Sequence, residues 1–453
     1  MASFEKLNKL FKGDKVIWIV FLLLCVISIV EVYSASSTLG YRSGNYWSAA
    51  VAHAFRLGIG IFVMITLVNI KCRYFKLVTP VLSIVAVPML IFVLFFGVSE
   101  NDASRWISLG SINIRPSELG KAAMVFVTAQ ILSAMQTKDG AAPQTMKYIL
   151  IASLFLILPI VPENLSTAAM LAFVVFLMML IGRVPMKQLG YLVSAVLLLV
   201  ALAIAFILMV GQSPSDKQMQ DKDEMHLTDV SSVAQLQGVD ISSIPEAHLK
   251  KYEKKEKPSP WEKFTHRSDT WKGRLLGFFD KRDIPPEDYD LDKNSQVGYS
   301  RIAIVSSNIV GKGPGSSVQR DFLPQAYSDF IYAIIVEEFG LFGAIIVAFL
   351  YIVLLYRTNT IAKNCKNPFP AYLAMGLALL IVTQALFNMS VAVGIVPITG
   401  QPLPLISRGG TSSIINCAYL GVILSISRTA AKKAAPTKET PSEQKAVTDV
   451  AQA

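Results

Sequence analysis

The chain has 453 residues, of which 53% are hydrophobic and 16% charged, and its mean hydropathy is +0.49. This composition excludes a soluble domain of that length and indicates a membrane protein. In such a protein the formal net charge of +10 records orientation and contact with anionic lipid, so we expect membrane lipid and no nucleic acid as a partner. The four cysteines and four histidines show no spacing typical of a disulfide or a metal site.

Hydrophobic runs long enough to cross a bilayer recur along the chain, and the first lacks a cleavage site, which predicts a retained helix. The fifth and sixth runs are short and flank Pro162-Glu-Asn-Leu-Ser166. We predict an all-α polytopic membrane protein with about ten transmembrane helices. The predicted spans are 16–34, 50–69, 77–96, 116–135, 147–162, 167–182, 188–210, 329–356, 370–395 and 412–427.

Basic residues in the short connections predict the orientation of these helices. They precede the first span and follow every even-numbered span, so with ten spans all of them lie on one side. By the positive-inside rule that side is the cytoplasm, with both termini in it. The residues are Lys6, Lys9, Lys12, Lys15, Lys71, Arg73, Lys76, Lys138, Lys147, Arg183, Lys187, Arg357, Lys363, Lys366, Arg428, Lys432 and Lys433.

The predicted domain organisation is a single membrane domain, residues 16–428, between a cytoplasmic N-terminus, residues 1–15, and a disordered cytoplasmic tail, residues 429–453. A large extracytoplasmic loop, residues 212–328, joins the seventh and eighth spans. Its part 213–260 has the composition of a mobile segment.

Two glycine-rich stretches lie on the predicted extracytoplasmic side. Residues 311–319 lack the Gly-Lys-Ser/Thr of a phosphate-binding loop, so we interpret them as a turn. Residues 394–410 combine glycine and proline with a weakly apolar character, which at membrane depth is typical of backbone that lines a cavity.

Asp329 lies where the polar loop ends and a hydrophobic run begins, and Glu337 and Glu338 follow within ten residues. Acidic residues at the mouth of a membrane span are costly and usually functional. A helix that begins near Ser328 would place Asp329 at the water interface and Glu337 about two turns deeper, on the face that carries Ala333. The alternative is that Ser328 or Asp329 only caps the helix.

Further charges lie on the same predicted side. Glu118 and Lys121 open the fourth span three residues apart and can face each other, with a plain ion pair at the interface as the alternative. Arginines on the extracytoplasmic side run against the positive-inside rule, so they call for another explanation. A phosphate ligand is one, because the guanidinium group binds phosphate well. Each arginine alone can also be a solvated loop charge. Together, an outer acid and several outer cations indicate an enzyme that acts on a polyanionic lipid headgroup. The arginines are Arg105, Arg115, Arg301, Arg320 and Arg408.

Four motifs resemble the SEDS family of bacterial cell-wall proteins, FtsW and RodA. They are Arg105-Trp-Ile107, Arg115-Pro-Ser-Glu118-Leu-Gly-Lys121, Ser328-Asp329-Phe-Ile-Tyr-Ala-Ile-Ile-Val-Glu337-Glu338-Phe-Gly340, and Pro397-Ile-Thr-Gly400 with Leu403-Pro-Leu-Ile-Ser-Arg-Gly-Gly410. Each motif is weak alone, but together they cover most of the chain and are highly specific. The loop Gly313-Pro-Gly-Ser-Ser-Val-Gln319 is more similar to the FtsW branch, which acts in cell division.

The resemblance implies a peptidoglycan glycosyltransferase that polymerises lipid II, the undecaprenyl-pyrophosphate-linked disaccharide pentapeptide, at the outer face of the bacterial cytoplasmic (inner) membrane. It implies lipid II, a class B penicillin-binding protein and divisome proteins as partners. The family's essential acid matches Asp329, and its cavity residues match Glu118 and Lys121. Further substrate contacts are assigned to Arg105, Glu337, Ser407, Arg408, Gly409 and Gly410.

The sequence departs from the family's usual pattern at two places. Asn164 stands where the family usually has an acid, which puts in doubt any role that needs a carboxylate there. Arg408 stands where the family has Tyr or Gly, and its charge can meet a pyrophosphate.

These features predict that Asp329 acts as general base on the 4-hydroxyl of an acceptor glucosamine, whose oxygen attacks the anomeric carbon of the donor muramic sugar with inversion. Lys121, the arginines or a divalent cation, Mg²⁺ or Mn²⁺, would balance the charge of the leaving undecaprenyl pyrophosphate, although no dedicated metal-ligand cluster is visible. Two other functions stay open. The chain can be a lipid II flippase, or a non-catalytic scaffold for a division transpeptidase.

Overall fold

The computed structural model of the chain describes residues 12–36, 47–96, 98–100, 103–109, 112–210, 291–323 and 326–434. The chain forms two compact units, one of residues 1–188, 290–395 and 399–453, and one of residues 189–289 and 396–398. The predicted mobile segment 213–260 lies outside the described residues. Most of the predicted tail also lies outside them, but residues 429–434 are helical and continue the last membrane helix.

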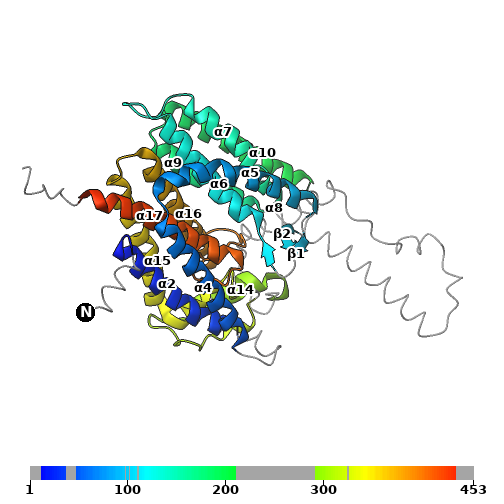
Figure 1. Ribbon diagram of the computed structural model, residues 1–453. Helices are drawn as coiled ribbons and strands as arrows, with labels where there is room; N and C mark the ends of the chain where they lie inside the picture. Colours follow the sequence, from blue (N-terminus) through cyan, green and yellow to red (C-terminus); the bar gives the residue numbers. More distant parts are fainter. Residues whose placement is uncertain are drawn as a thin grey trace, which may run out of the picture. The chain divides into compact units, whose positions relative to one another are not determined.

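Within the described part of the chain, every predicted span overlaps a helix, which confirms the all-α polytopic class (Figure 1). The fifth span, 147–162, overlaps two, α7 and the single turn α8 (Ile160–Glu163). The helices are α2 (Lys15–Ala35), α4 (Ser48–Asn69), α5 (Cys72–Phe96), α6 (Pro116–Ala134), α7 (Thr145–Leu156), α9 (Leu165–Ile181), α10 (Met186–Val210), α15 (Ile331–Lys363), α16 (Pro368–Ala392) and α17 (Thr411–Ala434). By length and composition alone, α2, α4, α5, α15, α16 and α17 are long and apolar enough to cross a membrane. The chain is therefore a multi-pass membrane protein.

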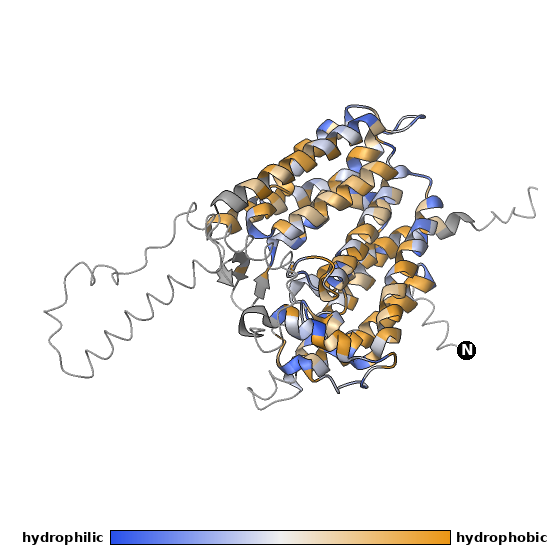
Figure 2. Ribbon diagram, turned by 180° about the vertical axis from the view of Figure 1, so that it is seen from behind, coloured by the Kyte–Doolittle hydropathy of each residue, from blue (hydrophilic) through white to orange (hydrophobic). Residues whose placement is uncertain are grey.

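Hydrophobic residues run along the helices, and hydrophilic residues gather at helix ends and in the connecting loops (Figure 2). On α5, for example, Leu77, Ile84 and Phe95 are exposed. Large apolar side chains left exposed in this way are expected where lipid replaces water around the protein.

Helix α16 is the most deeply buried of the long apolar helices, and it packs against α15, α6, α9 and α17. Its position makes the amide side chains of Gln384 and Asn388 interior groups, both almost fully buried. A buried amide without partners is costly, so these two side chains must be hydrogen-bonded within the protein.

Helix α15 is broken at Gly340, where φ is 67° and ψ is −165°. Only glycine adopts this conformation readily. The backbone of Gly311 approaches here, and a Cβ atom on Gly340 would lie 2.3 Å from the carbonyl oxygen of Ile309. The break separates a buried first part of α15 from the long second part, and it gives the 311–320 loop a docking place.

Two parts of the predicted loops contain regular structure. Between α5 and α6 lies a three-stranded antiparallel sheet of β1 (Val98–Glu100), β2 (Ala103–Leu109) and β3 (Ile112–Ile114), in the order β1-β2-β3. The large loop contains α14 (Leu291–Ser306) and a short 3-10 helix, η3 (Gln319–Asp321). These elements are too short or too polar to give a membrane-span signal.

Candidate active site

Asp329 lies in a turn, two residues before α15 begins at Ile331. The helix therefore begins later than predicted, and Asp329 does not share a helical face with Ala333 and Glu337. The capping alternative is also wrong, because Phe330 occupies the N-cap position without a side-chain cap. Ser328 Oγ instead donates to Asp329 Oδ1 at 2.9 Å. The Asp329 side chain stays partly exposed, so a ligand can reach it.

Asn388 of α16 fixes the backbone at Asp329. Its Nδ2 donates to the carbonyl oxygens of Asp329 and Gln401, each at 2.7 Å. Gly400, with φ of 65°, lies beside the carboxylate, because a Cβ atom there would be 3.5 Å from Asp329 Oδ2. One buried amide thus joins the acid to the loop that precedes α17.

Glu118 and Lys121 lie at the start of α6, where Pro116 and the acid itself favour helix initiation. Lys121 Nζ donates to Glu118 Oε1 and to Gln384 Oε1, both at 2.9 Å, and both charged side chains are buried. Gln384 Nε2 donates in turn to the carbonyl oxygen of Pro402 at 3.0 Å. The Gln384 amide therefore links the ion pair to Pro402, which adjoins the Gln401 carbonyl that Asn388 binds.

The segment from Ser407 to Gly410 is bound to the Asp329 turn. Ser407 Oγ donates to the carbonyl oxygen of Ser328 at 2.5 Å, and the Arg408 backbone N–H donates to that of Tyr327 at 2.9 Å. The Arg408 guanidinium lies 5.2 Å from the ring centroid of Tyr327, a cation–π contact. The structure thus brings the predicted residues Ser407 and Arg408 to the catalytic candidate.

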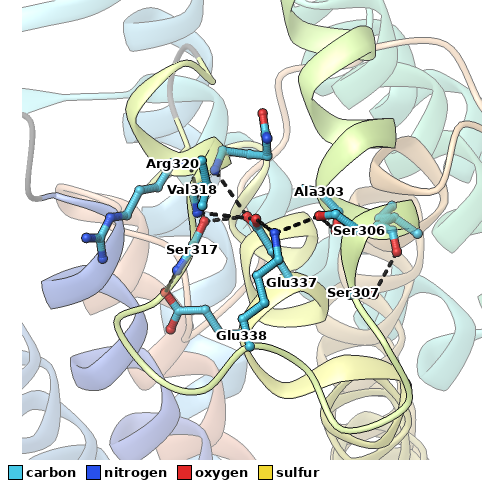
Figure 3. Close-up of polar contacts among 11 residues, drawn as sticks. Ala303, Ser306, Ser307, Ser317, Val318, Arg320, Glu337 and Glu338 are labelled. Atoms are coloured by element: carbon cyan, nitrogen blue, oxygen red, sulfur yellow. Dashed lines mark hydrogen bonds and ion pairs between the residues drawn. The ribbon is translucent and has the colours of Figure 1, made fainter.

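Glu337 points into the 311–320 loop. Its carboxylate accepts from Lys312 Nζ at 2.6 Å, from Ser317 Oγ at 2.5 Å, and from the backbone N–H groups of Val318 and Gln319 at 3.2 and 3.3 Å. Figure 3 shows Glu337 at the centre of these contacts, with the Arg320 side chain pointing away. Glu337 is fully buried, and its structural partners already occupy both oxygens.

Glu338 holds the same loop from a second direction. Its carboxylate accepts from the backbone N–H groups of Gly315 and Ser317 at 2.8 and 3.3 Å, and from the hydroxyl of Ser34 in α2. Arg320 Nη1 donates to Ser34 Oγ at 2.9 Å and to the Gly315 carbonyl at 2.8 Å. The two adjacent acids are therefore structural anchors for the loop that leads to Asp329.

The remaining predicted residues divide between helix ends and the small sheet. Arg105 belongs to β2, but its side chain lies outside the described part of the structure. Asn164 is the N-cap of α9, where its Oδ1 accepts from the Thr167 backbone N–H at 3.1 Å. Asparagine and aspartate are similarly good caps, so this role needs an oxygen and not a charge.

Four residues of this network were missed from the sequence, namely Thr167, Gln384, Asn388 and Gln401. Gln401 Nε2 donates to Thr167 Oγ1, which ties the loop to the start of α9. Gln384 and Asn388 are four residues apart in an otherwise hydrophobic run. Two amides on one face of a membrane helix were the available signal, because such groups need buried partners.

Among the residues that the structure describes, no group of three or more His, Cys, Asp or Glu side chains gathers closely enough to hold a metal ion.

Comparison with known proteins covers nearly the whole chain. Residues 14–221 and 266–432 match the family of cell cycle proteins that includes FtsW, RodA and SpoVE. The probable peptidoglycan glycosyltransferase FtsW of Bacillus subtilis is 27% identical over 415 residues, which cover 89% of this chain and 88% of the relative. The peptidoglycan glycosyltransferase MrdB of Escherichia coli K12 is 27% identical over 419 residues, which cover 91% of this chain and 93% of the relative.

Solved structures share the fold. A chain from "Structural coordination of polymerization and crosslinking by a peptidoglycan synthase complex" matches with a TM-score of 0.61 and 20% identity, over 92% of this chain and 98% of that chain. The rod shape determining protein RodA of Thermus thermophilus matches with a TM-score of 0.57 and 19% identity, over 92% and 97% of the two chains.

Proposed function

Because the chain belongs to the FtsW/RodA/SpoVE family of cell cycle proteins, we propose that it is a peptidoglycan glycosyltransferase that polymerises lipid II into glycan strands. Relatives that match about nine-tenths of its length are named peptidoglycan glycosyltransferases, one of them as probable. The loop Gly313–Gln319, which is similar to the FtsW branch, favours a role in cell division.

The observation that carries the catalytic assignment is the setting of Asp329. Its carboxylate is partly exposed, while its backbone is held by Asn388 and its neighbour Ser328 by Ser407. A general base must be accessible to its substrate and fixed in position, and this acid satisfies both conditions.

The proposed reaction is one displacement. Asp329 takes the proton of the acceptor's 4-hydroxyl as that oxygen forms a bond to the anomeric carbon of the donor. The bond from that carbon to the diphosphate oxygen breaks, with inversion, and undecaprenyl pyrophosphate leaves with the electron pair. A positioned base contributes about 10²–10⁴-fold to such a step.

Of the two cations Lys121 and Arg408, only Arg408 has a side-chain atom without a protein partner that could bind the diphosphate. Lys121 is fully buried and bonded to Glu118 and Gln384, so it orders the loop beside Asp329. Arg408 has a buried Nη1 atom without a hydrogen-bond partner. A divalent cation, Mg²⁺ or Mn²⁺, stays a proposal for the substrate's own diphosphate, and no step above requires it.

The proposed setting is the bacterial inner membrane, with Asp329 on the extracytoplasmic side and both termini in the cytoplasm. The distribution of basic residues supports this orientation. We propose a class B penicillin-binding protein as partner, supported by a structural neighbour described as part of a peptidoglycan synthase complex. Other divisome proteins complete the proposed assembly.

The test is polymerisation of purified lipid II by the reconstituted chain with its transpeptidase partner, comparing wild type, Asp329→Asn and Asp321→Asn. Asp321 is an exposed acid of the same loop and serves as the matched control. We expect glycan strands from wild type and the control, and at least a hundredfold loss from Asp329→Asn. Equal strands from all three would move the base elsewhere. No strands from any, with intact binding of the partner, would favour the scaffold or the flippase.

A further inference from the structure

Two arginines, Arg56 and Arg408, have no acidic partner among the described residues. Arg56 lies within the hydrophobic helix α4, where its Nε donates to the Ala52 carbonyl of the same helix at 2.9 Å. Arg408 is partly buried, and its Nη1 is shielded from solvent without a hydrogen-bond partner. An arginine at membrane depth is costly and is normally paired with an acid, so Arg56 within α4 requires an explanation.

The two arginines lie at the same level of the structure. Helices α4 and α17 run parallel in contact, because a Cβ atom on Gly60 would meet Cys417 and Ile414, and one on Gly421 would meet Met64. Arg56 lies about one turn before Gly60, which places it level with the start of α17. Arg408 lies just before that start, and the charges of the two arginines are close enough to interact.

A buried histidine, His53, lies close enough to both arginines to be affected by their charges. His53 is fully buried, and the charges of Arg56 and Arg408 both act on it. Its Nε2 is 2.7 Å from Ser28 Oγ, which donates to the Ile406 carbonyl at 2.7 Å, and its Nδ1 has no partner in the described structure. An imidazole carries no negative charge, so His53 does not balance the charges of the two arginines.

The start of α17 adds to the positive potential. A helix N-terminus carries unpaired N–H groups and favours an anion. Gly409 and Gly410 precede it, and a Cβ atom on Gly410 would meet nothing within 4 Å, so there is space beside the backbone. The Thr411 hydroxyl oxygen is buried without a hydrogen-bond partner.

We propose that Arg56, Arg408 and the N-terminus of α17 form a binding site for the diphosphate group of a polyprenyl lipid. Two guanidinium groups match the charge and the oxygen array of a diphosphate, and the position of Arg56 within a membrane helix favours a lipid-borne group over a free one. The Arg408 backbone is hydrogen-bonded to Tyr327, so the site adjoins Asp329. The identity of the lipid as the glycosyl donor rests on the proposed function.

The test is binding of farnesyl diphosphate to the full chain in phosphatidylcholine nanodiscs, measured by isothermal titration calorimetry. We expect Arg56→Gln and Arg408→Gln each to raise Kd about tenfold or more, because each removes a charge-assisted bond. Arg73→Gln is the matched control: Arg73 is an exposed arginine of α5 and should leave Kd unchanged. A wild-type Kd in both test variants would overturn the proposal.

A thermal measurement separates a binding role from a structural one. Without ligand, Arg56→Gln should melt no lower than wild type, because it removes a like charge that has no counter-ion. Farnesyl diphosphate should raise the Tm of wild type and should raise that of the variant much less. A variant that melts lower without ligand and keeps the full ligand-induced gain would show that Arg56 is structural.

Two further arms identify the source of the anion. The first arm replaces farnesyl diphosphate by inorganic pyrophosphate; equally tight binding would indicate a site for free anions. The second arm uses phosphatidylglycerol nanodiscs; loss of farnesyl diphosphate binding there would indicate a general site for lipid phosphates. Either result would refute the assignment to a polyprenyl diphosphate. Because binding needs no turnover, loss of the proposed polymerase activity leaves this test intact. Polymerisation by wild type with unchanged Kd in both arginine variants would refute only the present inference.

Discussion

Replacing Glu337 by glutamine should release the 311–320 loop. The carboxylate receives four donors, and an amide can keep only the two that reach its single oxygen while its N–H₂ group faces the others. Removing one member of a buried ion pair costs about 3–5 kcal/mol. Lys312 keeps 29% of its side chain exposed and can be hydrated, so we expect the lower end, about 3 kcal/mol.

Amide hydrogen exchange measures this release directly. The backbone N–H groups of Val318 and Gln319 donate to the Glu337 carboxylate, and those of Gly315 and Ser317 donate to the Glu338 carboxylate, so all four should be protected in wild type. A loss of about 3 kcal/mol predicts roughly a hundredfold faster exchange across 312–319 in Glu337→Gln. Asp321→Asn, which changes an exposed acid, should leave these amides protected. Unchanged exchange in Glu337→Gln would refute the anchoring role and return Glu337 to the predicted substrate contacts.

Three further predictions concern stability in detergent, measured by thermal unfolding. Asn164→Asp should keep the wild-type stability and Asn164→Ala should lose about 1 kcal/mol, because the cap needs only a side-chain oxygen; equal losses in both would contradict this. Glu118→Gln or Lys121→Met alone should lower the stability by about 3–5 kcal/mol, because each leaves one buried charge without its partner. The double variant should recover part of this loss. Additive losses would show that the pair is not coupled. Gly340→Ala should cost about 3 kcal/mol, because its backbone conformation is nearly restricted to glycine; a wild-type melting temperature would disprove this.

The sequence determines the membrane helices well because length and hydropathy are local properties. Nine of the ten predicted spans each meet one helix. The fifth, 147–162, meets α7 and the single turn α8, and the sixth, 167–182, is α9. The hydropathy pattern predicts loops where the structure has the strands β1, β2 and β3 and helix α14. Their stability depends on pairing and packing partners, which a hydropathy pattern does not reveal.

The site was predictable in its charges and not in its hydrogen bonds. Asp329 and the pair Glu118–Lys121 are conspicuous in the sequence, because charged residues at hydrophobic helix ends are rare. Their connection runs through Gln384 and Asn388, which bond to backbone carbonyls of a loop distant in sequence. Such contacts depend on the packing of α16 in the interior, so no local pattern could specify them.

The same limit explains the interpretation of Glu337. A helix that begins at Ser328 would have aligned it with Asp329, but the turn before Ile331 and the break at Gly340 give it a different partner. The glycines at 311 and 340 were visible in the sequence, but their close approach was not.

The most direct test of the central claim measures lipid II binding and single-turnover glycosyl transfer on the same preparation of Asp329→Asn. We predict that labelled lipid II binds with an affinity close to that of wild type, because the variant keeps the Oδ1 acceptor for Ser328, while transfer falls at least a hundredfold. Transfer at the wild-type rate would contradict the assignment of Asp329 as the base. A loss of transfer matched by an equal loss of binding would make Asp329 a substrate-binding residue instead.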